Sequence, residues 1–207
     1  PMTSNIKFET ANALAHGAPL EGGFYGGVIT IPNAPLHAVV WAPKAQGQVR
    51  AMWLPSYGDV PNATSYYDSM GNTRAMAEAG SPLAKLALAA NINGFTDWCI
   101  PARDVLEMRY RYLKPTDEEN SCTFRDGDNP SSLPAGYPYT PNNPAQTSNE
   151  LFKDGGAEAL DPAWYVSSTQ YSSHDAWLQH FRNGSQDHYY KRVEARALFC
   201  RLIPLNT

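Results

Sequence analysis

Two short segments contain residue types that could do hydrolytic or metal chemistry. Ser172-Ser173-His174-Asp175 has the side chains of a hydrolytic triad. Residues adjacent in sequence cannot face one another in the required relay, however, and the chain has no Gly-x-Ser-x-Gly turn. Asp126-Gly127-Asp128-Asn129 is rich in oxygen ligands, but calcium needs roughly six to eight oxygens around it, and ordinary turns have the same composition. We assign no catalytic residue, metal site or cofactor to either segment, and calcium binding stays open.

The three cysteines, Cys99, Cys122 and Cys200, form no CxxC pair and have no histidine at a zinc-binding spacing. Buried free thiols are favoured over a single disulfide, because free cysteine packs as a small apolar side chain. A thiol-dependent enzyme would need Cys99 and Cys200 to meet at an open cleft. We therefore expect a protein that is not an enzyme, and the disulfide state stays open.

The residues of the C-terminal end predict a small antiparallel sheet, and the segment 172–175 lies within it. Aromatic and β-branched runs at 164–169, 176–181 and 195–203 alternate with polar turns. Asn183-Gly184 predicts a two-residue type I′ hairpin turn, since both residues tolerate a positive φ. The run 195–203 predicts one central, buried strand.

Earlier in the chain, the pattern predicts further strands at 24–31, 37–42 and 49–54 and helices at 73–90 and 102–113. Gly80-Ser81-Pro82 interrupts the first helix, with Asn72 or Thr73 as its first cap and Ser81 as its second. The expected core-facing residues are Leu83, Leu86, Ala87 and Ala90 of the first helix, and Leu106, Tyr110 and Leu113 of the second. Residues 116–162 are rich in Pro, Asn, Gly and Ser, which predicts a long loop insertion pinned to the body by Phe124, Tyr137, Tyr139 and Phe152.

The composition excludes several classes of function. The 207 residues carry a net charge of -4, whereas nucleic-acid binding needs a concentrated basic patch. The nearest candidate, Arg103 with Arg109 and Arg111, is interpreted as a solvated helix face. No apolar run is long enough to span a membrane. We expect residues 1–22 to form an arm or attachment segment and residues 23–207 to form one domain.

The order of several motifs between residues 22 and 203 resembles the C-terminal domain family of collagen-like adhesins, a C-type-lectin-like family that is also common among bacteriophage virion proteins. The shared motifs are Asp97-Trp98-x-x-Pro101-x-Arg103-x-x-Leu106, Ser167-Ser168-Thr169, Ala176-Trp177-x-x-x-Phe181-x-x-Gly184, and Lys191 ahead of Arg196-x-x-x-x-Arg201. The phage-type members are resembled at Gly26-Gly27-Val28, Ala42-Pro43-Lys44, Asn72-Thr73, Tyr139-Thr140 and Pro144-Ala145-Gln146-Thr147. The sequence departs from the pattern at Cys99, where the family has a basic residue, and at Tyr165-Val166 ahead of the serines.

The resemblance implies an α+β, C-type-lectin-like fold: two helices packed on a twisted antiparallel sheet, with long loop insertions and neighbouring termini. It also places Trp98 and Trp177 in the core and makes Arg103 and Arg201 internal hydrogen-bond anchors. The sulfatase-modifying enzymes share this architecture and use a close thiol pair.

A polar and aromatic rim around the predicted hairpin is the candidate ligand-binding surface. Its side chains are of the types that adaptable recognition surfaces use, because tyrosine supplies contact area at low entropic cost and Ser and Asn supply hydrogen bonds. The rim consists of Tyr171, Ser172, His174, Gln179, Arg182, Asn183, Gln186, His188 and Tyr190. An ordinary solvated hairpin remains the other interpretation.

These observations lead to two functional hypotheses. In the first, the protein is a phage tail-fibre or tail-tip component, located on the virion and outside the cell, that binds a host surface glycan or protein. In the second, it is a capsid or tail decoration protein that contacts other virion subunits through residues 1–23 and 116–162. In both, we expect a homo-oligomer that neither binds nucleic acid nor inserts into a membrane.

Overall fold

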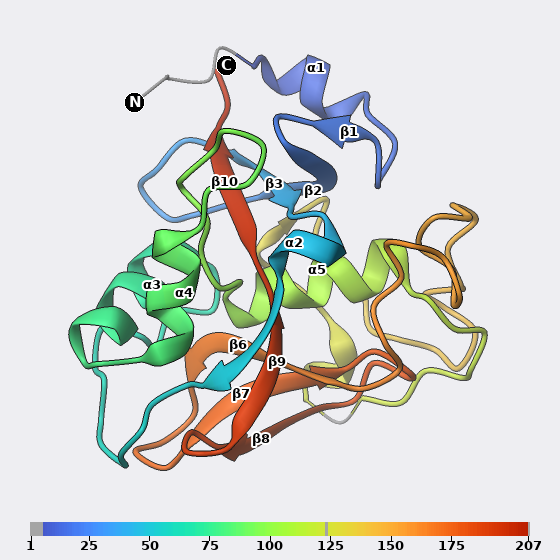
Figure 1. The fold of residues 1–207 in the computed structure, drawn as a ribbon. Coiled ribbons are helices and arrows are strands. Elements are labelled where there is room, and N and C mark those ends of the chain that lie inside the picture. Colours follow the sequence, from blue (N-terminus) through green and yellow to red (C-terminus); the bar gives the residue numbers. More distant parts are fainter. Residues whose placement is uncertain (1–5, 123, 207) are drawn as a thin grey trace.

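In the described part of the chain, two five-stranded sheets form the frame, and three longer helices pack around them (Figure 1). The computed structural model describes residues 6–122 and 124–206. Its architecture is α+β with curled, mainly antiparallel sheets, which confirms the predicted class. No helix in the described part of the chain is both long and apolar enough to cross a membrane.

The first sheet has the order β1-β2-β3-β10, and β5 pairs with β2 beside this path. All its pairs are antiparallel. The predicted strands at 24–31 and 37–42 are thus confirmed as neighbours. The strands span Pro19–Leu20 (β1), Gly23–Ile29 (β2), His37–Trp41 (β3), Ser132–Leu133 (β5) and Cys200–Pro204 (β10).

The second sheet has the order β4-β9-β6-β7-β8, and it contains most of the predicted C-terminal sheet. Its pairs are antiparallel except for β6 and β9, which run parallel and are paired at Tyr165 and Arg196. The strands span Gln48–Met52 (β4), Trp164–Gln170 (β6), Asp175–His180 (β7), Gln186–Tyr190 (β8) and Glu194–Leu198 (β9).

The prediction of one continuous strand over 195–203 is wrong. The segment forms β9 in the second sheet and β10 in the first, and Phe199 makes the crossing. The backbone of Phe199 donates to the carbonyl of Gly47 and accepts from the amide of Ala42, at 3.0 Å in each bond. Both halves are extended and apolar, so the residue pattern did not show that they belong to different sheets.

The β7–β8 hairpin is confirmed, but its predicted type I′ turn is wrong. Gly184 donates to the carbonyl of His180, and His180 donates to that of Ser185, each at 2.8 Å, so residues 181–184 form a four-residue connection. Only Gly184 has a positive φ (81°) in this connection. Phe181 is the reason, because its buried ring packs edge-on against Tyr165, and a longer loop is needed to turn it inward.

The predicted two-part helix is confirmed as α3 (Ser69–Glu78) and α4 (Pro82–Ala89). Ser81 caps α4 as predicted, since its hydroxyl accepts from the amide of Ala84 at 3.1 Å. The first cap was placed wrongly: Asp68 accepts from the amide of Gly71 at 2.9 Å. Asn72 and Thr73 are instead buried within α3, where their side chains hydrogen-bond to Ser65 and to Ser69 and Ile100.

One residue of the predicted core face of α4 points outward. Leu83 and Ala87 are buried as expected, whereas Leu86 is 47% exposed. The neighbouring Ala84 is fully buried, so the buried arc of the helix is centred between Leu83 and Ala84. Leu86 lies outside that arc.

The helix α5 (Arg103–Leu113) is buried on nearly every side. Leu106, Tyr110 and Leu113 lie in the core as predicted, but the interpretation of its arginines as a solvated face is wrong. The insertion 116–162 folds over this helix and covers them, with little regular structure of its own beyond a short 3₁₀ turn at Arg125–Gly127 and β5. The three arginines, Arg103, Arg109 and Arg111, are each at most 6% exposed.

The described part of the N-terminal segment packs on the first sheet. It includes α1 (Phe8–Asn12), and the amide of Phe8 donates to the carbonyl of Asn206 at 3.0 Å, so the two ends of the described chain lie together (Figure 1). Residues 1–5 of the predicted arm lie outside the described residues. The remaining short helix, α2 (Lys44–Gly47), leads into β4.

Candidate recognition surface

The predicted rim residues separate into three groups. The first group gathers at the open end of β7 and β8 and consists of Tyr171, Ser172, His174, His188 and Tyr190. The rings of Tyr171 and His188 are stacked at 3.8 Å, and His188 Nδ1 lies 2.8 Å from the Asp175 carboxylate. Tyr171 and Tyr190 are about half exposed, which makes this end of the hairpin an aromatic surface.

The second group lies at the opposite end of the hairpin and consists of Arg182 and Asn183. Arg182 is exposed and forms an ion pair of 2.9 Å with Glu118 of the insertion. The carbonyl of Asn183 accepts from the amide of Ser121 at 2.9 Å. These two residues therefore attach the insertion to the hairpin.

The third group, Gln179 and Gln186, is buried, so its place on an exposed rim was predicted wrongly. Gln179 Nε2 donates to the hydroxyl of Tyr139 and to the carbonyl of Gly184, both at 3.2 Å. Gln186 Oε1 accepts from the guanidinium of Arg103. The two strands carry these amides on the face that meets α5 and the insertion, where they bind internal partners.

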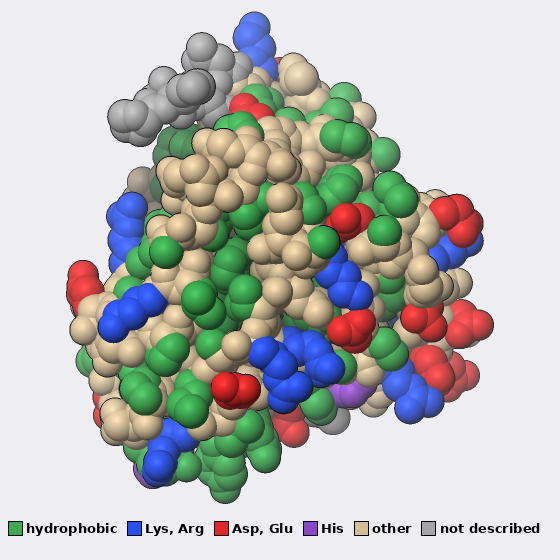
Figure 2. Space-filling view, viewed as in Figure 1, with side chains coloured by type: hydrophobic (Ala, Val, Ile, Leu, Met, Phe, Trp, Pro, Cys, Tyr) green, Lys and Arg blue, Asp and Glu red, His purple; other side chains and the backbone are tan. Residues whose placement is uncertain are grey.

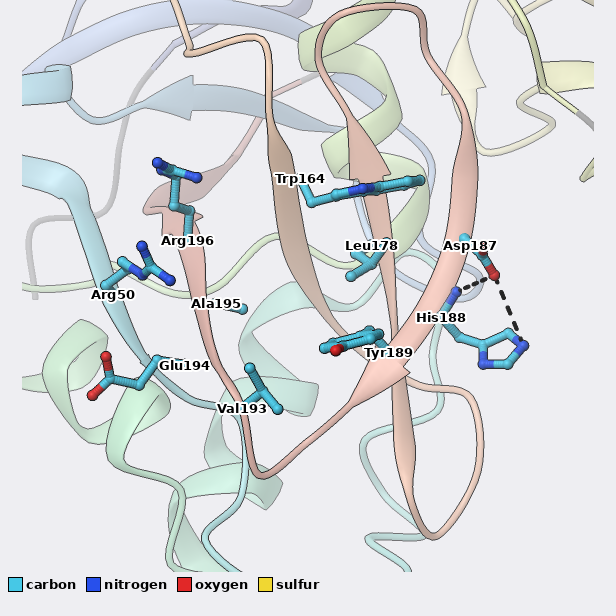
Figure 3. A pocket seen from close by; sticks show the side chains of 10 residues that line it. All are labelled: Arg50, Trp164, Leu178, Asp187, His188, Tyr189, Val193, Glu194, Ala195 and Arg196. Atoms are coloured by element: carbon cyan, nitrogen blue, oxygen red, sulfur yellow. Dashed lines mark hydrogen bonds and ion pairs between the residues drawn. The ribbon is translucent and has the colours of Figure 1, made fainter.

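The structure contains a groove on the second sheet that the rim prediction largely missed (Figure 3). Its volume is about 280 Å³, and its lining is mostly apolar. Of the predicted rim residues, only His188 lines it. The lining residues are Arg50, Trp164, Leu178, Asp187, His188, Tyr189, Val193, Glu194, Ala195 and Arg196.

The register of the strands brings the aromatic part of the groove together. Trp164 pairs with His180 and Leu178 pairs with Asp187, so Trp164, Leu178 and Tyr189 lie on one face of β6, β7 and β8. Trp164 is 38% exposed, and its indole packs edge-to-face on the ring of His180 at 4.8 Å. This contact fixes an exposed tryptophan in place, as a preformed binding site requires.

Two arginines flank the groove on β4 and β9. Arg50 and Arg196 are direct partners across these antiparallel strands, so their side chains leave the same face as neighbours. Figure 2 shows basic side chains gathered over β4 and β9, with acidic side chains beside them. The groove therefore combines exposed aromatic rings with cationic hydrogen-bond donors.

Asp161 balances part of this charge. Its carboxylate lies 2.9 Å from Lys44 Nζ and 3.6 Å from Arg196 Nε. Burial opposes ionisation of this carboxyl, but the hydrogen bond and charge of Lys44, with Gln48 and Arg196, outweigh it and lower the pKa of Asp161. Asp161 is thus an anion held mainly by Lys44.

The residues that could do hydrolytic or thiol chemistry are not arranged for it in the fold. Ser173 Oγ lies 2.9 Å from His174 Nδ1, whereas the Asp175 carboxylate is paired with His188, so the four residues 172–175 do not form a relay. Cys99 and Cys200 do approach, with their Sγ atoms 3.8 Å apart. Both are free thiols and fully buried, and the hydrogen bond with the Cys200 thiol, together with burial, raises the pKa of Cys99.

The oxygen-rich turn at 126–129 does not gather its side chains around a common centre. Asn129 is fully buried and donates to the Glu107 carboxylate at 2.7 Å, while Asp128 lies 3.7 Å from Arg125. Among the described residues, no group of three or more His, Cys, Asp or Glu side chains has a metal-binding arrangement.

The expected internal positions of four residues are confirmed. Trp98 and Trp177 are buried, and Arg103 donates to the carboxylate of Asp104 at 2.7 Å. Arg201 donates two hydrogen bonds to the Asp97 carboxylate in a bidentate contact. These residues support the frame beneath the surface and are not available to a ligand.

Comparison with known proteins adds no assignment. No protein-family model matches the sequence, and no curated protein matches it. The candidate site therefore depends on its geometry alone.

The groove residues had a signal in the sequence that could have located them. Trp164 directly precedes Tyr165, and Tyr189 directly precedes Tyr190. Adjacent residues of a strand face opposite sides of a sheet, so each pair must place one aromatic ring on each face. Applied to β6 and β8, this rule indicates aromatic residues on both faces, although only the register between strands shows that Trp164 and Tyr189 share one of them.

Proposed function

We propose that this protein is a non-enzymatic recognition component of a phage particle, in a tail fibre or at a tail tip, that binds a host surface glycan through the groove on its second sheet. The observation that carries the proposal is the exposed, fixed indole of Trp164 beside Tyr189, with Arg50 and Arg196 at the edge of the same groove. Aromatic faces with a few convergent polar groups are suited to a sugar ring, which has one apolar face and a polar periphery.

The assignment to a phage virion is carried by the resemblance to C-type-lectin-like virion proteins. Several structural features agree with that fold: the paired strands near the ends of the chain, the helices beside the sheets and the long insertion. We therefore propose a C-type-lectin-like fold, a place on the outside of the virion and assembly as a homo-oligomer. The aromatic end of the hairpin, with Tyr171 and Tyr190, would extend the binding surface toward a protein ligand.

Binding to whole host cells and to an array of bacterial surface polysaccharides tests this proposal. Trp164→Ala and Tyr189→Ala should each reduce binding about tenfold or more, because buried aromatic anchors contribute most of the energy of such interfaces. Tyr190→Ala and His188→Ala test the hairpin end separately. Leu86→Ala, which truncates an exposed apolar residue of α4, is the matched control and should bind as the wild type does. Unchanged binding by Trp164→Ala and Tyr189→Ala would contradict the groove as the binding site, and unchanged binding by all four variants would contradict glycan recognition by this sheet altogether.

A structural role on the capsid or tail is the second candidate, and the edge strand β8 favours it. This strand is the last in its sheet, and an edge strand of this kind can pair with a strand of another virion subunit. The described parts of residues 1–23 and the insertion 116–162 pack on the domain itself and give less support to this role. Electron microscopy of the virion separates the two, since decoration predicts many copies on the shell and recognition predicts a few at the tail.

A further inference from the structure

The pairing of Arg50 with Arg196 is unfavourable unless something else binds there. The two residues face each other across β4 and β9, and like charges in that position destabilise a sheet. The side chain of Arg50 is exposed and has no hydrogen bond or ion pair within residues 6–122 and 124–206. Its five N–H donors are therefore turned to solvent at the edge of the groove.

The nearby carboxylates leave this charge largely free. Asp161 binds Lys44 at 2.9 Å and reaches Arg196 only at 3.6 Å. Asp187 accepts from the amide of His188 at 2.8 Å, and among the described residues the Glu194 carboxylate forms no ion pair with Arg50 or Arg196 (Figure 3). An anion from outside the protein would neutralise the charge of the two arginines.

We infer that the groove selects an acidic saccharide, in which one sugar ring packs on Trp164 and Tyr189 and an oxyanion on a neighbouring sugar unit is bound by Arg50 and Arg196. The planar guanidinium group suits this task because it binds a carboxylate, sulfate or phosphate through two parallel hydrogen bonds. Aromatic residues and arginines line one continuous groove, so a single ligand of a few sugar units can reach both. This inference rests on the proposed function and specifies the chemistry of its ligand.

Calorimetric titration of the full chain with matched oligosaccharides tests the inference. The probes are a trimer of galacturonic acid, a trimer of galactose and a sulfated trimer of galactose, each measured at low and at high salt. We expect the acidic trimers to bind at least tenfold more tightly than the neutral trimer, with an advantage that shrinks as salt rises. Preference for the carboxylate over the sulfate, or the reverse, identifies which oxyanion the arginines fit, and either supports the inference.

Substitutions then separate this inference from the proposed function. Arg50→Gln with Arg196→Gln should reduce binding of the acidic trimers about tenfold or more and leave binding of the neutral trimer unchanged. Arg74→Gln with Lys85→Gln removes the same charge from exposed positions on α3 and α4 and should change neither.

Equal binding of acidic and neutral trimers, lost in Trp164→Ala, would overturn the inference and leave the glycan-binding proposal intact. Binding of the acidic trimers that the arginine variant retains would also overturn it. If no trimer binds and none of the cell-surface polysaccharides binds either, both fail.

Discussion

The hydroxyl of Tyr139 donates a hydrogen bond of 2.8 Å to the buried carboxylate of Glu107, which joins the insertion 116–162 to α5. The same carboxylate receives Arg111 Nε at 2.8 Å and Asn129 Nδ2 at 2.7 Å. Burial raises the pKa of Glu107, and Arg111, Asn129 and Tyr139 oppose that effect. A buried ionic network therefore holds the long insertion in place.

Tyr139→Phe tests this link. Loss of the hydroxyl removes one of the hydrogen bonds to the buried Glu107 carboxylate and one of the two that Gln179 Nε2 donates, so we expect the free energy of unfolding to fall by about 1–3 kcal/mol. Urea denaturation gives the value. Tyr137→Phe is the control, since the hydroxyl of that half-exposed tyrosine bonds only to an exposed Asn143, and the change should stay within about 0.5 kcal/mol. Equal effects of the two substitutions would contradict the network.

Two separate constraints favour glycine at position 184 of the hairpin. Its φ is +81°, and an added Cβ would lie 2.5 Å from Cε1 of Tyr110. Gly155 has a similar φ of +86° but nothing within 4 Å. Both alanine variants should lose about 1–2 kcal/mol from the left-handed backbone. Gly184→Ala should lose roughly 1–3 kcal/mol more through overpacking, a difference that thermal denaturation measures. Equal losses would mean that Tyr110 moves aside freely.

The stability of the protein should fall on acidification because of His16. Burial lowers the pKa of this histidine to about 4, and its ring is stacked on that of Tyr112 at 3.8 Å. Between pH 6.5 and about 4 the unfolded chain binds a proton that the folded protein does not, so the free energy of unfolding decreases as the pH falls.

His16→Phe keeps a stacked ring but cannot titrate. The unfolding free energy of this variant should depend less on pH in that window. The slope should correspond to an uptake on unfolding that is smaller by up to about one proton. Carboxylates contribute equally to both proteins, so the difference between the two slopes reports His16. Identical slopes would contradict the low pKa.

The paired arginines predict a conflict between stability and binding. If Arg50 is retained for a ligand, Arg50→Gln should raise the free energy of unfolding by roughly 0.2–1 kcal/mol, because it removes a like-charge pair across β4 and β9. Chemical denaturation at low salt measures this gain, which should diminish as salt is added. A loss of stability would mean that Arg50 supports the sheet.

Much of the frame could be predicted because local residue chemistry determines it. Ser81 and Pro82 specify the start of α4, and the apolar spacing of Leu106, Tyr110 and Leu113 specifies the buried side of α5. The paired strands β2 and β3 follow from two apolar runs separated by prolines. These features depend on neighbours within a few positions.

The errors concern contacts between distant segments. Arg103, Arg109 and Arg111 are of a residue type that is mostly exposed, and only the covering insertion makes them internal. Phe199 looks like the middle of a strand, but Gly47 and Ala42 draw it across to the other sheet. Similarly, the groove exists because β4 and β9 lie beside β6 to β8, a topology that no local pattern contains.

The most direct test of the groove uses fluorine NMR of protein that contains 5-fluorotryptophan. The chain has five tryptophans; Trp41, Trp53, Trp98 and Trp177 are at most 7% exposed, and Trp164 is 38% exposed. The spectrum of Trp164→Phe lacks one fluorine signal, which identifies that signal as the one from Trp164. On addition of a surface polysaccharide that the protein binds, the signal of Trp164 should shift with saturation while the four buried signals stay in place. A bound ligand that leaves the Trp164 signal unchanged would contradict the groove as the recognition site.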